Sequence, residues 1–178
     1  MSGWGKMILV ATVALLPLLP CHCQSRSLGA TFSFSNIGIS YEHELNAPGT
    51  YIETALRAET AEMFAGRKKY PGVSASVVWN NTFKEWESSA GNTIKLYAGL
   101  GLAAGFAPDM QDVNGLFGGL KGKIGGECLF TRKTIISIAL TPILGLHLVE
   151  YPDHYTMKFY KIGLIYSIAP EIGIKYRF

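Results

Sequence analysis

The clearest pattern in the chain is a two-residue alternation over its last nineteen residues. Between Tyr160 and Phe178 the even-numbered positions are apolar or aromatic, and the odd-numbered positions are mostly small or charged. Because side chains of a strand point alternately to its two faces, this pattern predicts a strand with one apolar and one polar face. The predicted strand ends at an aromatic residue, Phe178.

The same alternation recurs upstream, separated by turn signals. It predicts seven further strands, at residues 28–34, 37–45, 52–61, 73–80, 92–107, 116–130 and 134–149. Asn46 to Gly49 and residues 131–133 are predicted to be tight turns at one end. Residues 62–72, 108–114 and 150–157 are predicted to be longer loops at the other end. Residues 81–91 are an exception, because they are predicted to be a long connection at the end that has the tight turns. A tight turn at Ser35 and Asn36 would separate the first two strands, although a single bulged strand would also fit.

Eight strands in this arrangement predict an all-β fold, an antiparallel up-and-down transmembrane β-barrel with both termini at one end. The polar faces carry many slim residues, among them Gly99, Gly101, Gly105, Gly119, Gly125, Gly163 and Gly173. Glycine marks places where space is short, and the interior of an eight-stranded barrel is only wide enough to be filled by side chains. We therefore expect the polar faces to point inward and the apolar faces to meet lipid. The alternative is a soluble periplasmic, lipocalin-like carrier with an apolar cavity.

Residues 1–23 are predicted to be a cleaved secretory signal peptide, followed by one domain, the barrel, at 24–178. Lys6 precedes an apolar stretch from Met7 to Leu19 that is too short to span a membrane as a helix. Only Cys128 of the three cysteines would survive cleavage, so no intramolecular disulfide is expected. The formal net charge of +3 is spread along the chain, which gives no indication of nucleic-acid binding.

An export signal and a final strand ending in Tyr176, Arg177 and Phe178 resemble the small outer-membrane β-barrels of Gram-negative bacteria. The layout is similar to the transmembrane barrel of the outer-membrane protein A type, without its periplasmic domain. The resemblance implies a location in the cell outer membrane, with periplasmic termini. It also implies contact with outer-membrane lipid and lipopolysaccharide, and recognition of the C-terminal strand by the barrel-assembly machinery.

Charged residues on the inward faces are the first group of candidate functional residues. Buried ions need partners, because an isolated ion is costly in a medium of low dielectric constant. Six acids and seven bases are nearly balanced, so we expect pairing that plugs the lumen, with a narrow or gated ion path as the alternative. Arg57 is expected to pair inside, between Glu53 and Glu59 of its own strand. The predicted lumen charge network comprises Glu42, Glu44, Glu53, Arg57, Glu59, Lys95, Lys121, Lys123, Glu127, Lys161, Glu171, Lys175 and Arg177.

Aromatic and basic residues of the outer surface form two smaller groups. Tyr166 and Tyr176 share the apolar face, and their spacing corresponds to about 25 Å of membrane at a strand tilt of about 40°. The predicted aromatic girdle comprises Trp79, Phe106, Phe130, Tyr166, Tyr176 and Phe178. Arg67, Lys68 and Lys69, in an outward loop, are candidates for contact with lipopolysaccharide phosphates or an acidic partner.

These features predict a small outer-membrane barrel with a structural, surface-binding or narrow porin-like role and no enzymatic activity. The alternative is a lipid-A-modifying deacylase or acyltransferase, which would need a serine activated by a histidine. His43 and His147 have no obvious serine partner in the sequence, although residues distant in sequence can meet in the fold. No cofactor is expected. No metal site is expected either, because Glu42 and Glu44 share a face without a histidine or cysteine at ligand spacing.

Overall fold

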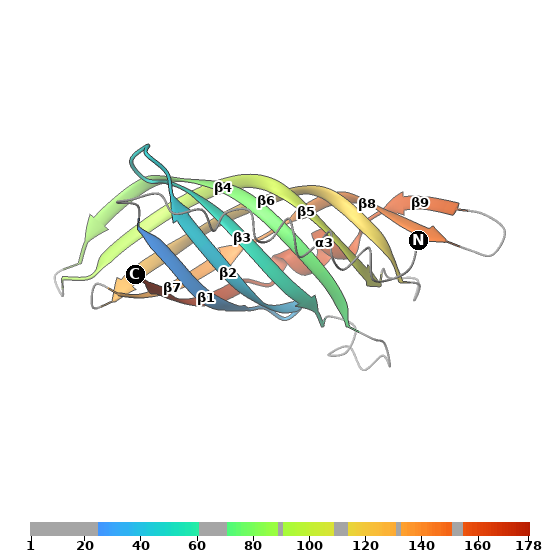
Figure 1. Ribbon diagram of the computed structural model, residues 1–178, viewed down its shortest axis with the longest axis horizontal. Helices are drawn as coiled ribbons and strands as arrows, with labels where there is room; N and C mark the ends of the chain where they lie inside the picture. The colour runs from blue at the N-terminus through green and yellow to red at the C-terminus, as the bar shows by residue number, and fades with distance from the viewer. Residues whose placement is uncertain (1–24, 61–70, 89–90, 109–113, 131–132, 151–154) are drawn as a thin grey trace.

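The computed structural model describes residues 25–60, 71–88, 91–108, 114–130, 133–150 and 155–178, which form a closed antiparallel β-barrel (Figure 1). The predicted signal peptide lies outside these residues. The strands are β1 (Arg26–Phe32), β2 (Asn36–Glu44), β3 (Thr50–Glu59), β4 (Gly72–Glu87), β5 (Thr93–Pro108), β6 (Asn114–Phe130), β7 (Thr134–Leu140), β8 (Ile143–Glu150), β9 (Tyr155–Phe159) and β10 (Glu171–Arg177). Two short helical turns, α3 (Ile162–Ile165) and η2 (Tyr166–Ile168), connect β9 to β10. No described helix is long and apolar enough to cross a membrane.

These segments build eight strands of barrel wall. β7 and β8 are one wall strand interrupted at Thr141 and Pro142, since Leu140 faces Ile124 and Ile143 faces Lys121 in a single register along β6. Proline has no N–H to donate to a neighbouring strand, which explains an interruption at this point. β9 and β10 belong to the eighth strand, and β10 closes the barrel by pairing with both β7 and β1. The eight-stranded antiparallel fold predicted from the sequence is confirmed.

The two ends of the barrel differ in what they carry. At the end that we call the terminal rim, Phe178 N donates to Arg26 O at 2.9 Å, so the beginning of β1 and the end of β10 lie side by side. At the opposite end, the distal rim, Ser33 N donates to Asn36 O at 2.8 Å and closes the turn between β1 and β2. The predicted turn between the first two strands therefore exists, centred slightly earlier than Ser35 and Asn36.

The hairpin of β4 and β5 is longer than predicted. Residues 81–91 were expected to be a connection, but β4 continues to Glu87 through a register shift between Thr82 and Lys84. A bulge places one extra residue, Phe83, in the strand and reverses the alternation, which hid the continuation in the sequence. Because pairing of β3 with β4 ends at Asn81, the hairpin projects beyond the terminal rim (Figure 1).

The predicted strand at 160–178 is a strand only from Glu171 onward. Phe159 faces Leu146, and Glu171 faces Ala139. From Phe159 to Glu171 the chain therefore advances twelve residues, while the neighbouring wall strand, β7 with β8, advances only seven. A continuous ladder has no room for the five extra residues, and the chain forms α3 and η2 instead. The facing predicted here is consequently wrong: Tyr160 is buried inside, and Lys161, placed in the lumen by the alternation, is exposed.

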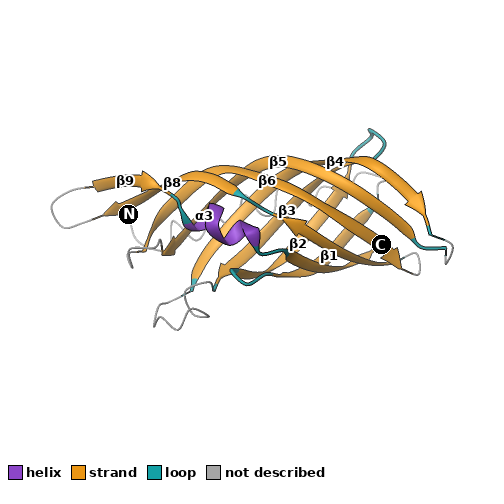
Figure 2. Cartoon of the chain, turned by 180° about the vertical axis from the view of Figure 1, so that it is seen from behind, coloured by secondary structure: helices purple, strands orange, loops and turns teal. Residues whose placement is uncertain are grey.

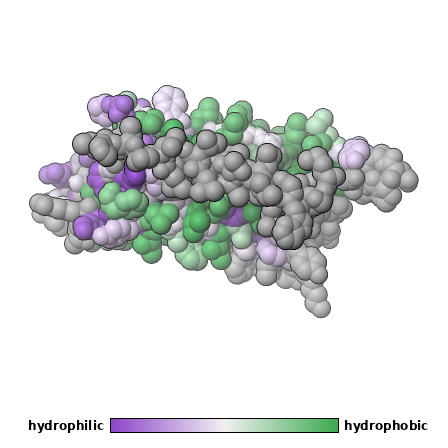
Figure 3. Space-filling view, in the orientation of Figure 1, coloured by the Kyte–Doolittle hydropathy of each residue, from purple (hydrophilic) through white to green (hydrophobic). Residues whose placement is uncertain are grey.

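Elsewhere the wall is apolar outside and polar inside. Leu100 and Leu102 are 62% and 64% exposed on the outer surface, whereas Tyr97 on the inward face is fully buried. Figure 3 shows hydrophobic residues along the middle of the visible face and hydrophilic residues gathered toward the end that carries the C-terminus. The interior is crowded, as the inward glycines predicted. A Cβ atom added at Gly105 would lie 2.7 Å from Phe117 Cε1.

Candidate functional site

Seven charged side chains meet in the interior and form what we call the buried ion cluster. They come from β2, β3, β6 and β10, whose inward positions face a common narrow lumen. None is more than 8% exposed. The buried ion cluster comprises Glu42, Glu53, Arg57, Lys123, Glu127, Glu171 and Lys175.

Lys175 of β10 is the centre of the cluster. Its Nζ donates to Glu42 Oε1 and, at 2.6 Å, to Glu127 Oε1, and Glu53 Oε2 lies 4.0 Å away. Ser27 Oγ donates to the other oxygen of Glu42 at 2.5 Å. Within the described ranges, neither Glu42 nor Glu127 has another base within 4.0 Å. One ammonium group therefore neutralises carboxylates from two different strands.

Arg57 of β3 organises the rest of the cluster. Its Nε and Nη2 donate to the two oxygens of Glu171 at 2.9 and 3.1 Å, which is a bidentate pair. Glu53 Oε1 lies 3.6 Å from Nη2. Lys123 donates to Glu53 Oε2 and lies 4.0 Å from Glu171 Oε1. Both halves of the cluster are thus connected through Glu53, which contacts all three bases.

Three residues of the predicted network, Glu44, Lys95 and Arg177, form ion pairs apart from the cluster, nearer the terminal rim. Arg177 Nη2 is 3.3 Å from Glu44 Oε1, and both side chains are partly exposed. Lys95 Nζ is 3.5 Å from Glu85 Oε2 on the β4–β5 hairpin. Solvent screens such pairs, so they stabilise the fold far less than the buried ion cluster does.

Two predicted network residues lie on the distal side of the cluster. Glu59 accepts a hydrogen bond from Ser74 Oγ at 2.5 Å. Lys121 Nζ lies 3.4 Å from Ser76 Oγ, the same oxygen that accepts from Arg57 Nη1 at 2.7 Å. In the described part of the chain, no carboxylate lies within ion-pair distance of Lys121 and no base within that distance of Glu59.

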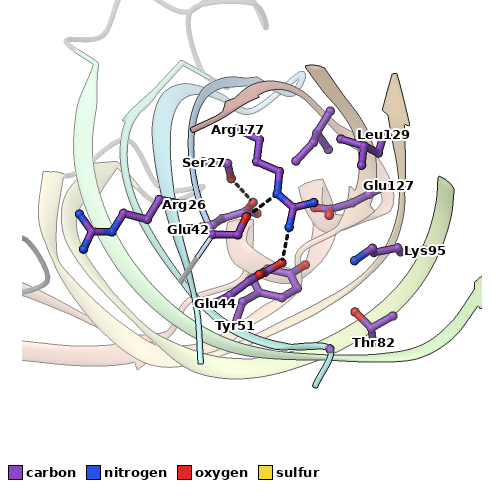
Figure 4. A pocket seen from close by; sticks show the side chains of 13 residues that line it. Arg26, Ser27, Glu42, Glu44, Tyr51, Thr82, Lys95, Glu127, Leu129 and Arg177 are labelled. Atoms are coloured by element: carbon purple, nitrogen blue, oxygen red, sulfur yellow. Dashed lines mark hydrogen bonds and ion pairs between the residues drawn. The ribbon is translucent and has the colours of Figure 1, made fainter. Parts of the chain in front are cut away.

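Small cavities lie on both sides of the cluster. The one at the terminal rim has a volume of about 50 Å³, and Figure 4 shows Arg177, Glu42, Glu44 and Tyr51 around it. The cavity toward the distal rim has a volume of about 30 Å³. Along β3, inward residues run from Tyr51 at the first cavity to Arg57 at the second, with Glu53 and Ala55 between them. The buried ion cluster thus separates two spaces that are each only large enough for water-sized molecules.

Aromatic side chains also pack inside the barrel. The rings of Phe117 and Tyr160 stack at 4.4 Å with an interplanar angle of 7°, and Tyr51 meets Tyr97 edge to face at 5.9 Å. Lys123 Nζ lies 5.5 Å from the centre of the Tyr97 ring. The alternation places Tyr51, Tyr97 and Phe117 on inward faces, so the sequence contains a signal for the position of these three rings. The sequence contains no such signal for Tyr160, because the alternation places it on the outer face.

The outer candidates have mixed outcomes. The predicted girdle residues Trp79, Phe106, Phe130, Tyr176 and Phe178 are exposed on the outer surface, and their role as a girdle stays a prediction. The side chain of Tyr166 lies outside the described part of the structure, as do Arg67, Lys68 and Lys69.

His147, one of the two histidines considered as possible partners of a serine, is buried in the interior. His147 Nε2 lies 2.9 Å from Ala107 O, and its ring stacks on Tyr160 at 5.9 Å. It therefore contacts a carbonyl group and an aromatic ring rather than a serine hydroxyl. Among the residues that the structure describes, no group of three or more His, Cys, Asp or Glu side chains could hold a metal ion.

No protein-family model matches the chain, and no curated protein matches it. Among solved structures, it is similar to the N-terminal β-barrel domain of Pseudomonas aeruginosa OprF, with a TM-score of 0.49, 13% identity and coverage of 87% of this chain and 97% of that one. A major outer membrane protein from Thermus thermophilus has a TM-score of 0.48 and 10% identity over 88% of this chain and 100% of that one. The Yersinia pestis outer membrane protein Ail has a TM-score of 0.36 and 13% identity over 87% of this chain and 98% of that one.

Proposed function

We propose that the protein is a small, non-enzymatic outer-membrane β-barrel that anchors its distal loops at the cell surface around a plugged lumen. The observation that carries this proposal is the reversed polarity of the barrel. Its outer surface presents residues such as Leu100, Leu102 and Ile124 over half exposed, while the buried ion cluster fills its interior. Such a surface is unfavourable in water and stable against hydrocarbon, and ions at membrane depth are expected to face the interior in pairs.

The buried ion cluster supports a structural lumen rather than a wide pore. Lys175 and Glu53 are almost fully buried, and the cavities on either side of the cluster are small. Water-filled porins are built from about 16 to 18 strands, twice the number found here. A narrow ion path through the cluster would require its pairs to separate, so we propose the plugged state as the resting one.

The aromatic end of the C-terminal strand, which resembles that of small outer-membrane barrels, supports a proposal for orientation and partners. We propose that the terminal rim is periplasmic, that the barrel-assembly machinery recognises the strand ending at Phe178, and that the outer surface contacts lipid and lipopolysaccharide. β3 ends and β4 begins at the distal rim, and we propose that Arg67, Lys68 and Lys69, which lie between these two strands in the sequence, contact lipopolysaccharide phosphates or an acidic partner. The signal peptide at 1–23 would direct export.

Two measurements test the proposal. The chain expressed with its signal sequence should fractionate with the outer membrane and show a heat-modifiable gel mobility. Recovery as a soluble periplasmic protein would contradict the membrane placement and favour the lipocalin-like carrier. The purified barrel in planar lipid bilayers should give no stable porin-sized conductance. Large, long-lived channels in most preparations would contradict the plugged lumen.

A further inference from the structure

The segment α3–η2, which we call the lateral panel, replaces part of a strand in the barrel wall. β9 pairs with β8 and with no other described strand, and β10 begins pairing with β1 only at Ile172. Figure 2 shows the panel within the wall, between the end of β9 and the start of β10. The wall at this place is therefore held by side-chain packing instead of a ladder of backbone hydrogen bonds.

The lateral panel has an apolar outer face and an inner face packed against the interior. Ile165 and Ile168 are 46% and 80% exposed, whereas Ile162 is buried. Gly163 is closely packed against the wall, since a Cβ atom there would lie 2.8 Å from both Ile143 O and Tyr160 Cδ1. In a membrane-embedded barrel, this panel would contact lipid on one side and the lumen on the other.

The distal cavity lies directly behind the panel, because Gly163 and Ser167 line it together with Asn36, Glu59 and Lys121. Lys121 is only 2% exposed and has Ser76 Oγ, at 3.4 Å, as its partner. Asn36 is 8% exposed, and its Nδ2 donates to Ser35 Oγ at 3.0 Å. Asn36 Oδ1 is buried without a hydrogen-bond partner among the described residues.

The cavity thus contains a cation and two acceptor groups with unused capacity. Lys121 can donate to an anionic oxygen, while the carboxylate of Glu59 and Oδ1 of Asn36 can accept from an ammonium group. A purely anionic ligand would meet Glu59, and a purely cationic ligand would meet Lys121. The arrangement is complementary to a ligand that carries both charges close together.

We propose that the distal cavity binds the zwitterionic headgroup of an ethanolamine phospholipid, which enters from the membrane past the lateral panel. Its phosphate would contact Lys121, its ammonium would contact Glu59 and Asn36, and its acyl chains would stay against the outer face formed by Ile165 and Ile168. The cavity of about 30 Å³ is smaller than the headgroup, so the panel must move outward to admit it. This inference rests on the proposed function in one respect, namely that the panel faces lipid.

Native mass spectrometry of the purified barrel in a non-ionic detergent tests the inference with three probes of related chemistry. Lysophosphatidylethanolamine should give a retained adduct at concentrations at which lysophosphatidylglycerol and free O-phosphoethanolamine give none. Lys121→Met and Glu59→Gln should each weaken this adduct by about tenfold, as expected for the loss of one charge-assisted contact. The matched control is Lys95→Met, on the other side of the buried ion cluster, which should leave the adduct unchanged.

Each result that would contradict the inference excludes a different part of it. Absence of the lysophosphatidylethanolamine adduct, or equal retention of lysophosphatidylglycerol, would overturn the zwitterion site. Equal binding of free O-phosphoethanolamine would overturn entry from the membrane. If Lys121→Met does not fold, Glu59→Gln, at a partly exposed position, supplies the same comparison. Fractionation of the unmodified protein with the outer membrane is measured separately, so a failure of the proposed function is distinguishable from a failure of this site.

Discussion

Lys175 Nζ and Glu127 Oε1 lie 2.6 Å apart inside the barrel, although the two residues are 48 positions apart in the sequence. β10 carries the lysine and β6 the glutamate, with β7 between them in the sheet. The same ammonium group contacts Glu42 of β2, on the other side of β1. A single side chain therefore connects wall segments on both sides of its own strand.

We expect Lys175→Met to lower the free energy of unfolding by about 3 to 5 kcal/mol, because Glu42 and Glu127 would remain buried without a base. Urea unfolding of the protein refolded into lipid vesicles measures this. The double variant Lys175→Met with Glu127→Gln should regain part of the loss. Lys95→Met is the control: its partner Glu85 is about half exposed, so the change should stay below about 1 kcal/mol. Equal losses in the two single variants would contradict the central role of Lys175.

Tyr160 provides a test of the lateral panel, because the sequence alternation and the structure place it on opposite faces. We expect Tyr160→Ala to lower the free energy of unfolding by about 3 kcal/mol, since the ring packs inside against Phe117. Tyr176→Ala, which removes an exposed ring of the outer surface, is the comparison and should have a clearly smaller effect in the same vesicles. The reverse order of the two effects would indicate that Tyr160 faces lipid.

Cys128 reports on the facing of β6. It shares the outward parity of Ile124 and Phe130, and its neighbour Glu127 is buried in the ion cluster. A thiol facing lipid is out of reach of a charged reagent in the water phase, so Cys128 should resist a charged maleimide and react with an apolar one in the folded, membrane-embedded protein. Mass spectrometry of the labelled protein gives the ratio. Rapid modification by the charged reagent, with the barrel still folded, would reverse the assignment of inside and outside, because a one-residue shift moves every side chain to the other face.

Phe178 is expected to matter for assembly more than for stability. Its side chain is exposed, and its backbone N–H donates to Arg26 O at 2.9 Å, so the ring itself closes no core. Deletion of Phe178 should lower the amount of folded barrel in the membrane, while the fraction that folds should unfold at nearly the same urea concentration. Quantitative immunoblotting of membranes, with heat-modifiable mobility as the folding readout, tests this. A normal yield of folded protein would remove the proposed role in assembly.

The sequence determined the fold and most of the facing. Strand direction alone sends successive side chains to opposite faces, so Leu100 points outward and Tyr97 inward without any knowledge of their neighbours. The prediction of facing was wrong where the backbone is no longer paired as a strand although apolar and polar residues still alternate. Between Tyr160 and Ile168 the apolar residues keep an even spacing. This segment nevertheless has five residues more than the neighbouring strand can pair with, and the chain folds into the lateral panel there.

The partners inside the barrel were decided only by the tertiary structure. The sequence indicated that Arg57, between the inward-facing Glu53 and Glu59, is paired within the barrel, and it did not identify the main partner. The guanidinium group makes its bidentate pair with Glu171 of β10 and lies 3.6 Å from Glu53, while Glu59 accepts a hydrogen bond from Ser74. Alternation fixes which face a charge occupies. The side chain it meets across the lumen depends on how the closed sheet is staggered, and no local run of residues encodes that stagger.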